Sequence, residues 1–445
     1  MAYNCAVAQE DSNIKIDNIS EIPPSTARIP KMFSALRHYN FRLFWFGQMI
    51  SLVGTWMQNV GQGWLVLQLT NSAFLLGLVS ASGALPVLLF SSFGGVLADR
   101  FNKRNLIVIT QISATICALI LALLTLTKQV QYWQIIIIAS CLGTVMALDA
   151  PTRLCFVIEM VGREDLLNAI ALNSSVFNMA RIIGPAIAGL IIGSIGVGLC
   201  FLFNGVSFLP VILGLLIMKG NFEPIKGARE SFVQTYKQGF SYIRKDKRVI
   251  SFLALVACSS IFIMPYAMLM PIFARDILKV GPRGLGLLLA AAGAGALIGA
   301  LNLAALGNFK KKGRLVFWGS LIFTAGVFFF SFSANFYICL LLLFFVGWGM
   351  IIQNASINSL LQTMVSDQLR GRVMSLYTLT FIGMMPIGSL LAGFLANYFG
   401  AQLALRIGAI IVVIVIYIIY KQNKELFKLG ESDKNSTHLN KLPAL

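Results

Sequence analysis

The feature that most constrains this chain is a series of long apolar runs, each close to the length that crosses a lipid bilayer. A membrane helix needs about 20 predominantly apolar residues. The chain has twelve such runs, at 43–67, 74–97, 105–127, 132–155, 168–193, 197–218, 249–273, 284–305, 315–333, 336–359, 373–396 and 401–420. With 57% hydrophobic and 12% charged residues, it has too little polar surface for a water-soluble globule. The sequence therefore predicts an all-α integral membrane protein with twelve transmembrane helices.

Basic residues gather in alternate links between these runs. The basic links are 219–248, 310–314 and 370–372, and the nearly uncharged links are 70–72, 195–196, 333–335 and 398–401. Positively charged loops remain on the cytoplasmic side of a membrane, so the alternation predicts that both termini are cytoplasmic. The link at 275–283 departs from this pattern. It is predicted to be external, yet it carries three basic residues and one acidic residue. The net charge of +18 is thus a sign of topology and not of nucleic-acid binding.

The basic link at 219–248 divides the chain into two halves of six runs each. The halves echo each other: the Met-Val pair at 160–161 recurs at 364–365, and Pro185 has a counterpart in Pro386. Duplicated halves with a binding site between them are a recurring transporter plan. The predicted organisation is a cytoplasmic tail at 1–40, a six-helix bundle at 41–218, a basic cytoplasmic linker at 219–248, a second, pseudo-symmetric six-helix bundle at 249–420, and a tail at 421–445.

Three of the predicted helices carry stripes of polar residues at helical spacing. The stripes are Gln48, Ser51, Thr55, Gln58 and Gln62 in the first run, Ser174, Asn178, Arg181 and Pro185 in the fifth, and Asn354, Asn358 and Gln362 in the tenth. Polar side chains avoid lipid because each unpaired group costs free energy there. The stripes predict a shared aqueous cavity lined by Thr55, Gln58, Gln62, Asn178, Arg181, Asn354 and Asn358. The alternative is hydrogen bonding between helices, which contributes about 1 kcal/mol or less per contact.

Arg181 is the strongest candidate among these for contact with a substrate. It lies near the middle of its run, where an arginine costs about 2.5–3.5 kcal/mol on insertion scales. No carboxylate lies at a comparable depth in the runs. An arginine in a polar cavity attracts anionic or oxygen-rich groups of a substrate. The alternative is that Arg181 ties helices together through backbone carbonyls.

The loop between the second and third runs reads Gly-Val-Leu-Ala-Asp-Arg-Phe-Asn-Lys-Arg at 95–104. It resembles the G-x-L-a-D-r-x-g-r-k/r loop of the major facilitator superfamily, with Asn102 where that family usually has glycine. In transporters with this loop, an acidic residue at the end of the fourth helix commonly meets the loop's arginines, and Asp149 and Arg153 can pair across one helical turn. The resemblance implies a cytoplasmic latch that breaks as the halves rock, formed by Gly95, Asp99, Arg100, Lys103, Arg104, Asp149 and Arg153.

The first three runs are similar to the enterobactin-exporter-like branch of that superfamily, also known as the transmembrane secretion effector group. The similarity is carried by the segments at 41–48, 54–58 and 64–72, and by Asn-Met-Ala-Arg-Ile-Ile-Gly-Pro at 178–185. The branch includes siderophore exporters and relatives that export drugs or macrolides. The resemblance implies export from the cytoplasm across a bacterial inner membrane, driven by the proton gradient.

The chain departs from the broader drug–proton antiporters in two helices. Those proteins usually have an arginine four residues before a glycine in the fourth helix, where this chain has Ala139 before Gly143. Their glycine series in the fifth helix is only partly present. The positions predicted to serve helix packing or hinge motion are Gly184, Pro185, Gly189 and Pro386. No proton-carrying residue is assigned, because Asp99 and Asp149 are better explained as gating residues.

Several kinds of chemistry have no sequence signal here. There is no phosphate-binding loop of the G-x-x-x-x-G-K-[ST] type, and both histidines, His38 and His438, lie outside the runs. The seven cysteines show no metal-ligand spacing. We therefore predict no enzymatic activity, no cofactor and no metal. The expected partners are a small-molecule substrate, protons and the lipid bilayer, with no nucleic acid, and the protein is expected to be a monomer.

The predicted function is secondary active export of a small amphiphilic organic molecule by alternating access. Because Arg181 lacks a partner in the sequence pattern, a siderophore-type or other anionic metabolite is favoured as the substrate. Multidrug or macrolide efflux is the alternative. A non-transporting membrane receptor or scaffold is a further alternative, against which the polar stripes and the latch argue.

Overall fold

The computed structural model describes residues 31–220, 246–307, 309 and 311–422. All elements of this part of the chain are helices. In the N-terminal half they are η1 (Lys31–Arg37), α2 (Tyr39–Thr70), α3 (Ala73–Arg100), α4 (Lys103–Leu126), α5 (Tyr132–Val161), α6 (Leu166–Ser194), α7 (Val197–Ser207) and α8 (Leu209–Ile217). The tails predicted at 1–40 and 421–445 and the linker at 219–248 fall largely outside the described residues.

The C-terminal half is helical in the same way. Its elements are α10 (Lys247–Cys258), η2 (Ser259–Ile263), α11 (Tyr266–Ile272), η3 (Phe273–Ile277), α12 (Gly281–Leu306), α13 (Lys312–Phe330), α14 (Phe336–Met364), α15 (Asp367–Gly383), α16 (Met385–Phe399) and α17 (Ala401–Gln422). Each predicted run coincides with one helix or with consecutive helical pieces. The prediction of an all-α membrane protein is confirmed.

Eleven of these segments are long and apolar enough to cross a membrane by length and composition. The helix missing from that set is α2, although it has 32 residues. Its polar stripe lowers its hydropathy, so the count of twelve is consistent with the structure without being read directly from it. The fourth run extends as one helix through Pro151 to Val161.

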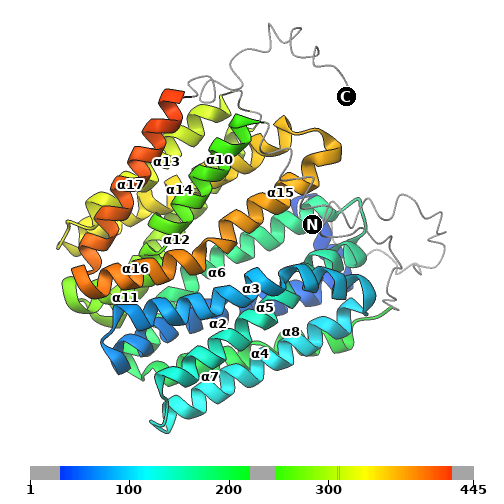
Figure 1. The fold of residues 1–445 in the computed structure, drawn as a ribbon. Helices are drawn as coiled ribbons and strands as arrows, with labels where there is room; N and C mark the ends of the chain where they lie inside the picture. The colour runs from blue at the N-terminus through cyan, green and yellow to red at the C-terminus, as the bar shows by residue number, and fades with distance from the viewer. Residues whose placement is uncertain (1–30, 221–245, 308, 310, 423–445) are drawn as a thin grey trace, which may run out of the picture.

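The two halves form separate helix bundles that meet along two pairs of helices. Figure 1 shows α2–α8, in blue to green, packed together, and α10–α17, in green to red, packed beside them. Within the halves the most extensive packing joins α3 to α5, and α14 to α12 and α13. Between the halves, α3 packs against α16 and α6 packs against α12. These two helix pairs therefore fix how the bundles sit relative to each other.

The turn between α3 and α4 explains why asparagine can replace the family glycine. Asn102 has a negative φ of −59°, so the position does not require glycine. Its side chain accepts a hydrogen bond from the backbone amide of Asn105 at 3.2 Å and caps α4, a role in which asparagine is among the best residues. Asn102, which departs from the family pattern, therefore serves as the N-cap of α4.

The seventh membrane segment contains two short π-helical turns, η2 and η3. The amide of Met264 donates to the carbonyl of Ser259 at 2.9 Å, and the amide of Leu278 donates to that of Phe273 at 2.8 Å. Such turns insert one extra residue into a helix and often occur at functional sites. The second of them carries Arg275, which joins the two halves.

Candidate functional site

The halves approach most closely at two glycine pairs on opposite sides of their interface. A methyl carbon added to Gly77 of α3 would lie 2.4 Å from the carbonyl oxygen of Ser389 and 3.1 Å from the Cα of Gly393. The same addition at Gly286 of α12 would lie 2.5 Å from the carbonyl of Pro185 and 3.1 Å from the Cα of Gly189. No side chain fits at such distances, so each pair needs glycine. The N-terminal parts of α3 and α12 thus pack backbone to backbone, α3 on the middle of α16 and α12 on the C-terminal part of α6.

Polar contacts reinforce the same end of the molecule. Arg275 of η3 donates from Nη1 to the carbonyl of Leu67 at 2.9 Å and to Oδ1 of Asn71 at 2.7 Å. Ser72 Oγ donates to Oδ1 of Asn397 at 3.2 Å. We call the two glycine pairs and these hydrogen bonds the end seal. It joins the halves where α2, α6 and α16 end and α3 and α12 begin.

The end seal was not predicted from the sequence. Its signal was present in the link at 275–283, whose charges broke the alternation of basic and neutral links. Arg275 bonds to the other half, and the side chain of Arg283 packs where a Cβ of Gly193 would lie, at 3.0 Å. Arg275 and Arg283 of this link therefore contact the N-terminal half.

Arg181 lies at the interface of the two halves, one helical turn before Pro185 of the end seal. Its Nη2 points to the sulfur of Met350 on α14 at 3.7 Å. Its guanidinium also interacts electrostatically with the Tyr266 hydroxyl of α11. Its own backbone carbonyl lies 3.0 Å from where a Cβ of Gly293 would be. In the described residues no carboxylate forms an ion pair with it. A residue of one half thus places its charge among apolar and neutral side chains of the other.

Two residues of the first polar stripe make hydrogen bonds within their own half. Gln58 is only 3% exposed, and its Oε1 accepts from Nδ2 of Asn204 on α7 at 2.6 Å. Thr55 donates to the carbonyl of Ser51 at 2.9 Å, while Gln62 is half-buried. Gln58 therefore makes the hydrogen bond between helices that was the alternative to a cavity role.

The other predicted cavity residues are half-buried and hold local hydrogen bonds. Asn178 donates to the carbonyl of Ser174 at 2.8 Å. Asn358 accepts from Gln362 at 2.6 Å, and the carbonyl of Asn354 accepts from the Tyr377 hydroxyl at 3.2 Å. Arg181 is the member of the set whose side chain reaches the opposite half. The cavity role of the whole set stays a prediction.

The predicted packing residues lie at contacts between helices. A Cβ on Gly184 would lie 2.5 Å from the Cβ of Trp56 on α2. Pro185 and Gly189 belong to the contact of α6 with α12 described above. Pro386 lies in the first turn of α16, directly after the break at Met384.

Four of the predicted latch residues, Lys103, Arg104, Asp149 and Arg153, make contacts within the N-terminal half in this conformation. Asp149 is 5% exposed. It pairs with Arg153, and it accepts hydrogen bonds from Thr110 at 2.6 Å and Gln111 at 3.1 Å. Arg104 donates to the carbonyl of Leu216 on α8 at 2.7 Å and not to Asp149. The side chain of Asp99 lies outside the described residues, Arg100 is exposed and Gly95 is half-buried.

Lys103 has a partner that the sequence analysis did not identify. Its Nζ lies 2.6 Å from Oε1 of Glu159, and the two side chains are 7% and 15% exposed. Glu159 lies in the last turn of α5. Helical spacing along α5 does not show that this turn lies beside the start of α4, so the pair could not be predicted from the sequence. The pair fastens the start of α4 to the end of α5.

We expect Lys103→Met to destabilise the protein by about 3–5 kcal/mol, because it leaves a buried carboxylate without its partner. The double variant Lys103→Met/Glu159→Leu should recover most of that loss, since both charges are gone. Thermal unfolding in detergent measures both. Arg248→Met is the control, because its pair with Asp246 is 45% exposed on the arginine side and should contribute less than about 1 kcal/mol. A double variant no more stable than Lys103→Met would contradict the account.

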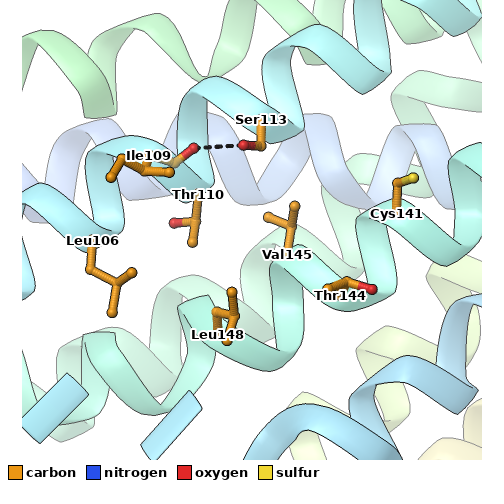
Figure 2. A pocket seen from close by; sticks show the side chains of 8 residues that line it. All are labelled: Leu106, Ile109, Thr110, Ser113, Cys141, Thr144, Val145 and Leu148. Atoms are coloured by element: carbon orange, nitrogen blue, oxygen red, sulfur yellow. Dashed lines mark hydrogen bonds between the residues drawn. The ribbon is translucent and has the colours of Figure 1, made fainter. Parts of the chain in front are cut away.

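A shallow groove lies between α4 and α5, with a volume of about 330 Å³. Figure 2 shows its lining, formed by Leu106, Ile109, Thr110, Ser113, Cys141, Thr144, Val145 and Leu148. The hydroxyl of Ser113 donates to the carbonyl of Ile109 at 2.9 Å, and that of Thr144 to Ser140 at 3.0 Å. None of the predicted cavity residues lines it, and its hydroxyls are already satisfied, so it offers a substrate little polar recognition.

The short helix η1 is fastened to the turn between α5 and α6. The Ser34 hydroxyl donates to Asp165 Oδ1 at 2.5 Å, and His38 Nε2 lies 2.8 Å from Asp165 Oδ2. The amide of Ala35 donates to Asn168 at 3.0 Å, and Ala35 is fully buried. Hydrogen bonds from Ser34 and His38 hold the pKa of the Asp165 carboxyl below its usual range.

We expect the docking of η1 to be stable at neutral pH and to weaken only in strong acid. A carboxyl whose pKa is lowered by folding stabilises the folded state above its unfolded pKa of about 3.9, and that stabilisation is lost as the pH falls through the lower, folded value. Asp165→Asn should increase hydrogen exchange of residues 31–38 at pH 7, whereas the exposed neighbour substitution Glu164→Gln should not. Equal protection in the two variants would refute the role of Asp165.

The model of the family described as transmembrane secretion effector matches residues 31–444. The chain belongs to this family of the major facilitator superfamily. The match covers both bundles and confirms the resemblance seen in the loop at 95–104. The protein is a multi-pass membrane protein of a transporter family.

Individual relatives extend over most of the chain at modest identity. A staphyloferrin A transporter of Staphylococcus aureus is 26% identical over 88% of this chain and 98% of its own length. A macrolide efflux protein A of Streptococcus pyogenes is 21% identical over 81% of this chain and 90% of its own length. An enterobactin exporter of Shigella boydii is 25% identical over 80% and 85%, respectively.

Solved structures agree on the fold. A crystal structure of the nucleoside transporter NupG superposes with a TM-score of 0.69 at 13% identity, covering 88% of this chain and 99% of that one. A bacterial homologue of the lysosomal transporter Spinster superposes with a TM-score of 0.67 at 14% identity, covering 90% and 98%. At these identities the likeness supports the two-bundle architecture alone.

Proposed function

We propose that this protein is a secondary active exporter of a small amphiphilic organic molecule, and that siderophore-type or other anionic metabolites are its substrates. Two of the relatives named above carry siderophores, staphyloferrin A and enterobactin. The observation that carries the substrate class is Arg181, whose charge lies between the halves without a carboxylate partner in the described residues. A guanidinium in that position selects carboxylate, phenolate or hydroxamate oxygens.

Transport proceeds by alternating access around this interface. The proposed domains are the two six-helix bundles at 41–218 and 249–420, joined by the cytoplasmic linker at 219–248. With both termini cytoplasmic, the end seal lies on the external side and keeps the pathway closed there. Opening the seal while the cytoplasmic side closes exposes the substrate at Arg181 to the exterior. The proton gradient of a bacterial inner membrane supplies the driving force.

The latch closes the cytoplasmic side in the opposite conformation. It comprises Asp99 and Arg100 at the C-terminal end of α3, together with the buried Asp149–Arg153 pair of α5 in the same half. Asp99→Asn should abolish most transport while membrane insertion remains normal, because the latch acts through charge. Efflux from energised vesicles measures the first quantity, and fractionation measures the second. Undiminished efflux would remove Asp99 from the gating step.

Efflux of macrolides or other drugs is the second candidate function. It is favoured by the macrolide efflux relative, which covers as much of the chain as the enterobactin exporter does. Met350 and Tyr266 beside Arg181 also offer the adaptable apolar contact that drug pockets use.

The deciding experiment compares culture supernatants of a parent strain and a deletion strain, both starved of iron, by mass spectrometry. Loss of an iron-chelating metabolite outside the cells, with its accumulation inside, supports siderophore export. Identical supernatants combined with a lowered resistance to macrolides would favour drug efflux instead.

A further inference from the structure

A second cavity lies where the start of α17 meets the end of the seventh membrane segment. Its volume is about 480 Å³, and it is lined by Ile272, Ile277, Phe399, Gly400, Ala401, Gln402, Leu403 and Arg406. Most of this lining is apolar, and Arg406 is its one charged side chain. The cavity therefore has the character of an amphiphile site with a single cationic end.

Arg406 is held rigidly in the wall of this cavity. Its Nη2 donates to the carbonyl of Ser331 at 3.1 Å and its Nε to the Ser331 hydroxyl at 3.3 Å. The guanidinium carbon lies 3.8 Å from the centre of the Phe332 ring. These contacts orient the guanidinium but do not neutralise it, because in the described residues no carboxylate forms an ion pair with Arg406. Asp276, the nearest acid in sequence to this lining, is paired with Arg275.

The cavity borders a face of α17 that carries exposed apolar side chains. Leu403, Ile410 and Tyr417 recur at helical spacing along this face and are 40%, 50% and 62% exposed. Arg406 is one turn from Leu403 and so belongs to the same face. It lies about 8 Å along the helix from Ala401, the first residue of this membrane segment, so that it is close to the end at which a lipid headgroup would lie. A lipid is thus the amphiphile that reaches this cavity directly.

We propose that this cavity, the Arg406 pocket, binds an anionic phospholipid, with Arg406 on the phosphate and the apolar wall against the acyl chains. Arginine matches phosphate geometry with two parallel donors, and Ser331 leaves most of its five N–H groups available. The pocket also touches the end seal, because Ile272 and Ile277 flank the segment that carries Arg275. A lipid bound here braces that segment and favours closure of the seal.

The test is native mass spectrometry of the whole protein with phosphatidylglycerol or phosphatidylcholine. The parent should retain phosphatidylglycerol and gain thermal stability from it, and Arg406→Gln should bind it about tenfold more weakly, the expected loss of one charge-assisted contact. Lys128→Gln is the control, since it removes one exposed positive charge from the same end of the molecule, outside the pocket. Equal retention by the parent and Arg406→Gln would overturn the proposal.

Two further measurements identify the source of the phosphate and guard against a variant that fails to fold. Inorganic phosphate that stabilises the parent as well as phosphatidylglycerol does would show that a free anion, and not a lipid, is the ligand. A photoactivatable phosphatidylglycerol on the parent protein should label the peptides around Ile272–Ile277 and Phe399–Leu403. Labelling confined to other segments would refute the site without any substitution.

Discussion

Gly77→Ala should slow transport about tenfold or more, although the protein should still insert and fold. The added methyl carbon would lie 2.4 Å from the Ser389 carbonyl, a backbone atom that cannot swing aside. Overpacking of this kind costs about 1–3 kcal/mol. The cost falls on the sealed conformation alone, because the contact partner belongs to the other half. Since about 1.4 kcal/mol changes an equilibrium tenfold, the protein should shift towards the conformation that is open at this end.

Gly83→Ala is the matched control for this prediction. It lies on the same helix, and its added methyl carbon would be 3.7 Å from the Ala139 carbonyl, an ordinary contact within one half. Spin labels at Lys128→Cys and Tyr337→Cys, on the two halves, report the opening as a longer distance. Gly286→Ala should reproduce the effect, because it meets the Pro185 carbonyl at 2.5 Å. Unchanged label distances in Gly77→Ala would show that the end seal does not govern the equilibrium.

Local physical chemistry was enough to predict the fold from the sequence. A run of about 20 apolar residues can satisfy its backbone in a bilayer only as a helix, so the helices followed from hydropathy alone. The motif at 95–104 was equally local, and in the turn that it contains Asn102 replaces glycine as a cap for α4. Helix breaks were harder to foresee. The two π-turns of the seventh segment carry no composition signal that separates them from α-helix.

The contacts between distant segments could not be predicted in the same way. Spacing placed Gln58 on the polar face of its helix, but its partner Asn204 is 146 residues away. Arg275 looked like an exception to the charge pattern, and its role appears only when Asn71 of the other half is beside it. A stripe on one helix says which residues share a face. It does not say whether that face meets a neighbour or a cavity, because helix packing decides the outcome.

The sequence singled out Arg181 by its depth in the membrane, and the structure adds its position between the halves. Its substitution is the second decisive prediction. Arg181→Ala should reduce transport of an anionic substrate by about 10- to 100-fold, because a hydrogen bond to a charged group contributes about 1.5–3 kcal/mol. A neutral substrate should lose far less. Arg181→Lys keeps the charge but loses the planar fork, so it should fall between the parent and Arg181→Ala. Efflux from vesicles, measured for one anionic and one neutral substrate, checks each expectation.

The neighbours of Arg181 separate substrate recognition from a structural tie. The contact with Met350 is a weak one, at 3.7 Å to sulfur, and Met350→Leu removes it while nearly preserving side-chain volume. If Arg181 serves the substrate, Met350→Leu should transport almost as well as the parent, because the guanidinium is still present between the halves. If its purpose is to hold α6 against α14, Met350→Leu and Arg181→Ala should weaken transport of both substrates to a similar degree. Only selective loss of the anionic substrate in Arg181→Ala is consistent with a charge that one half offers to a molecule bound between the two.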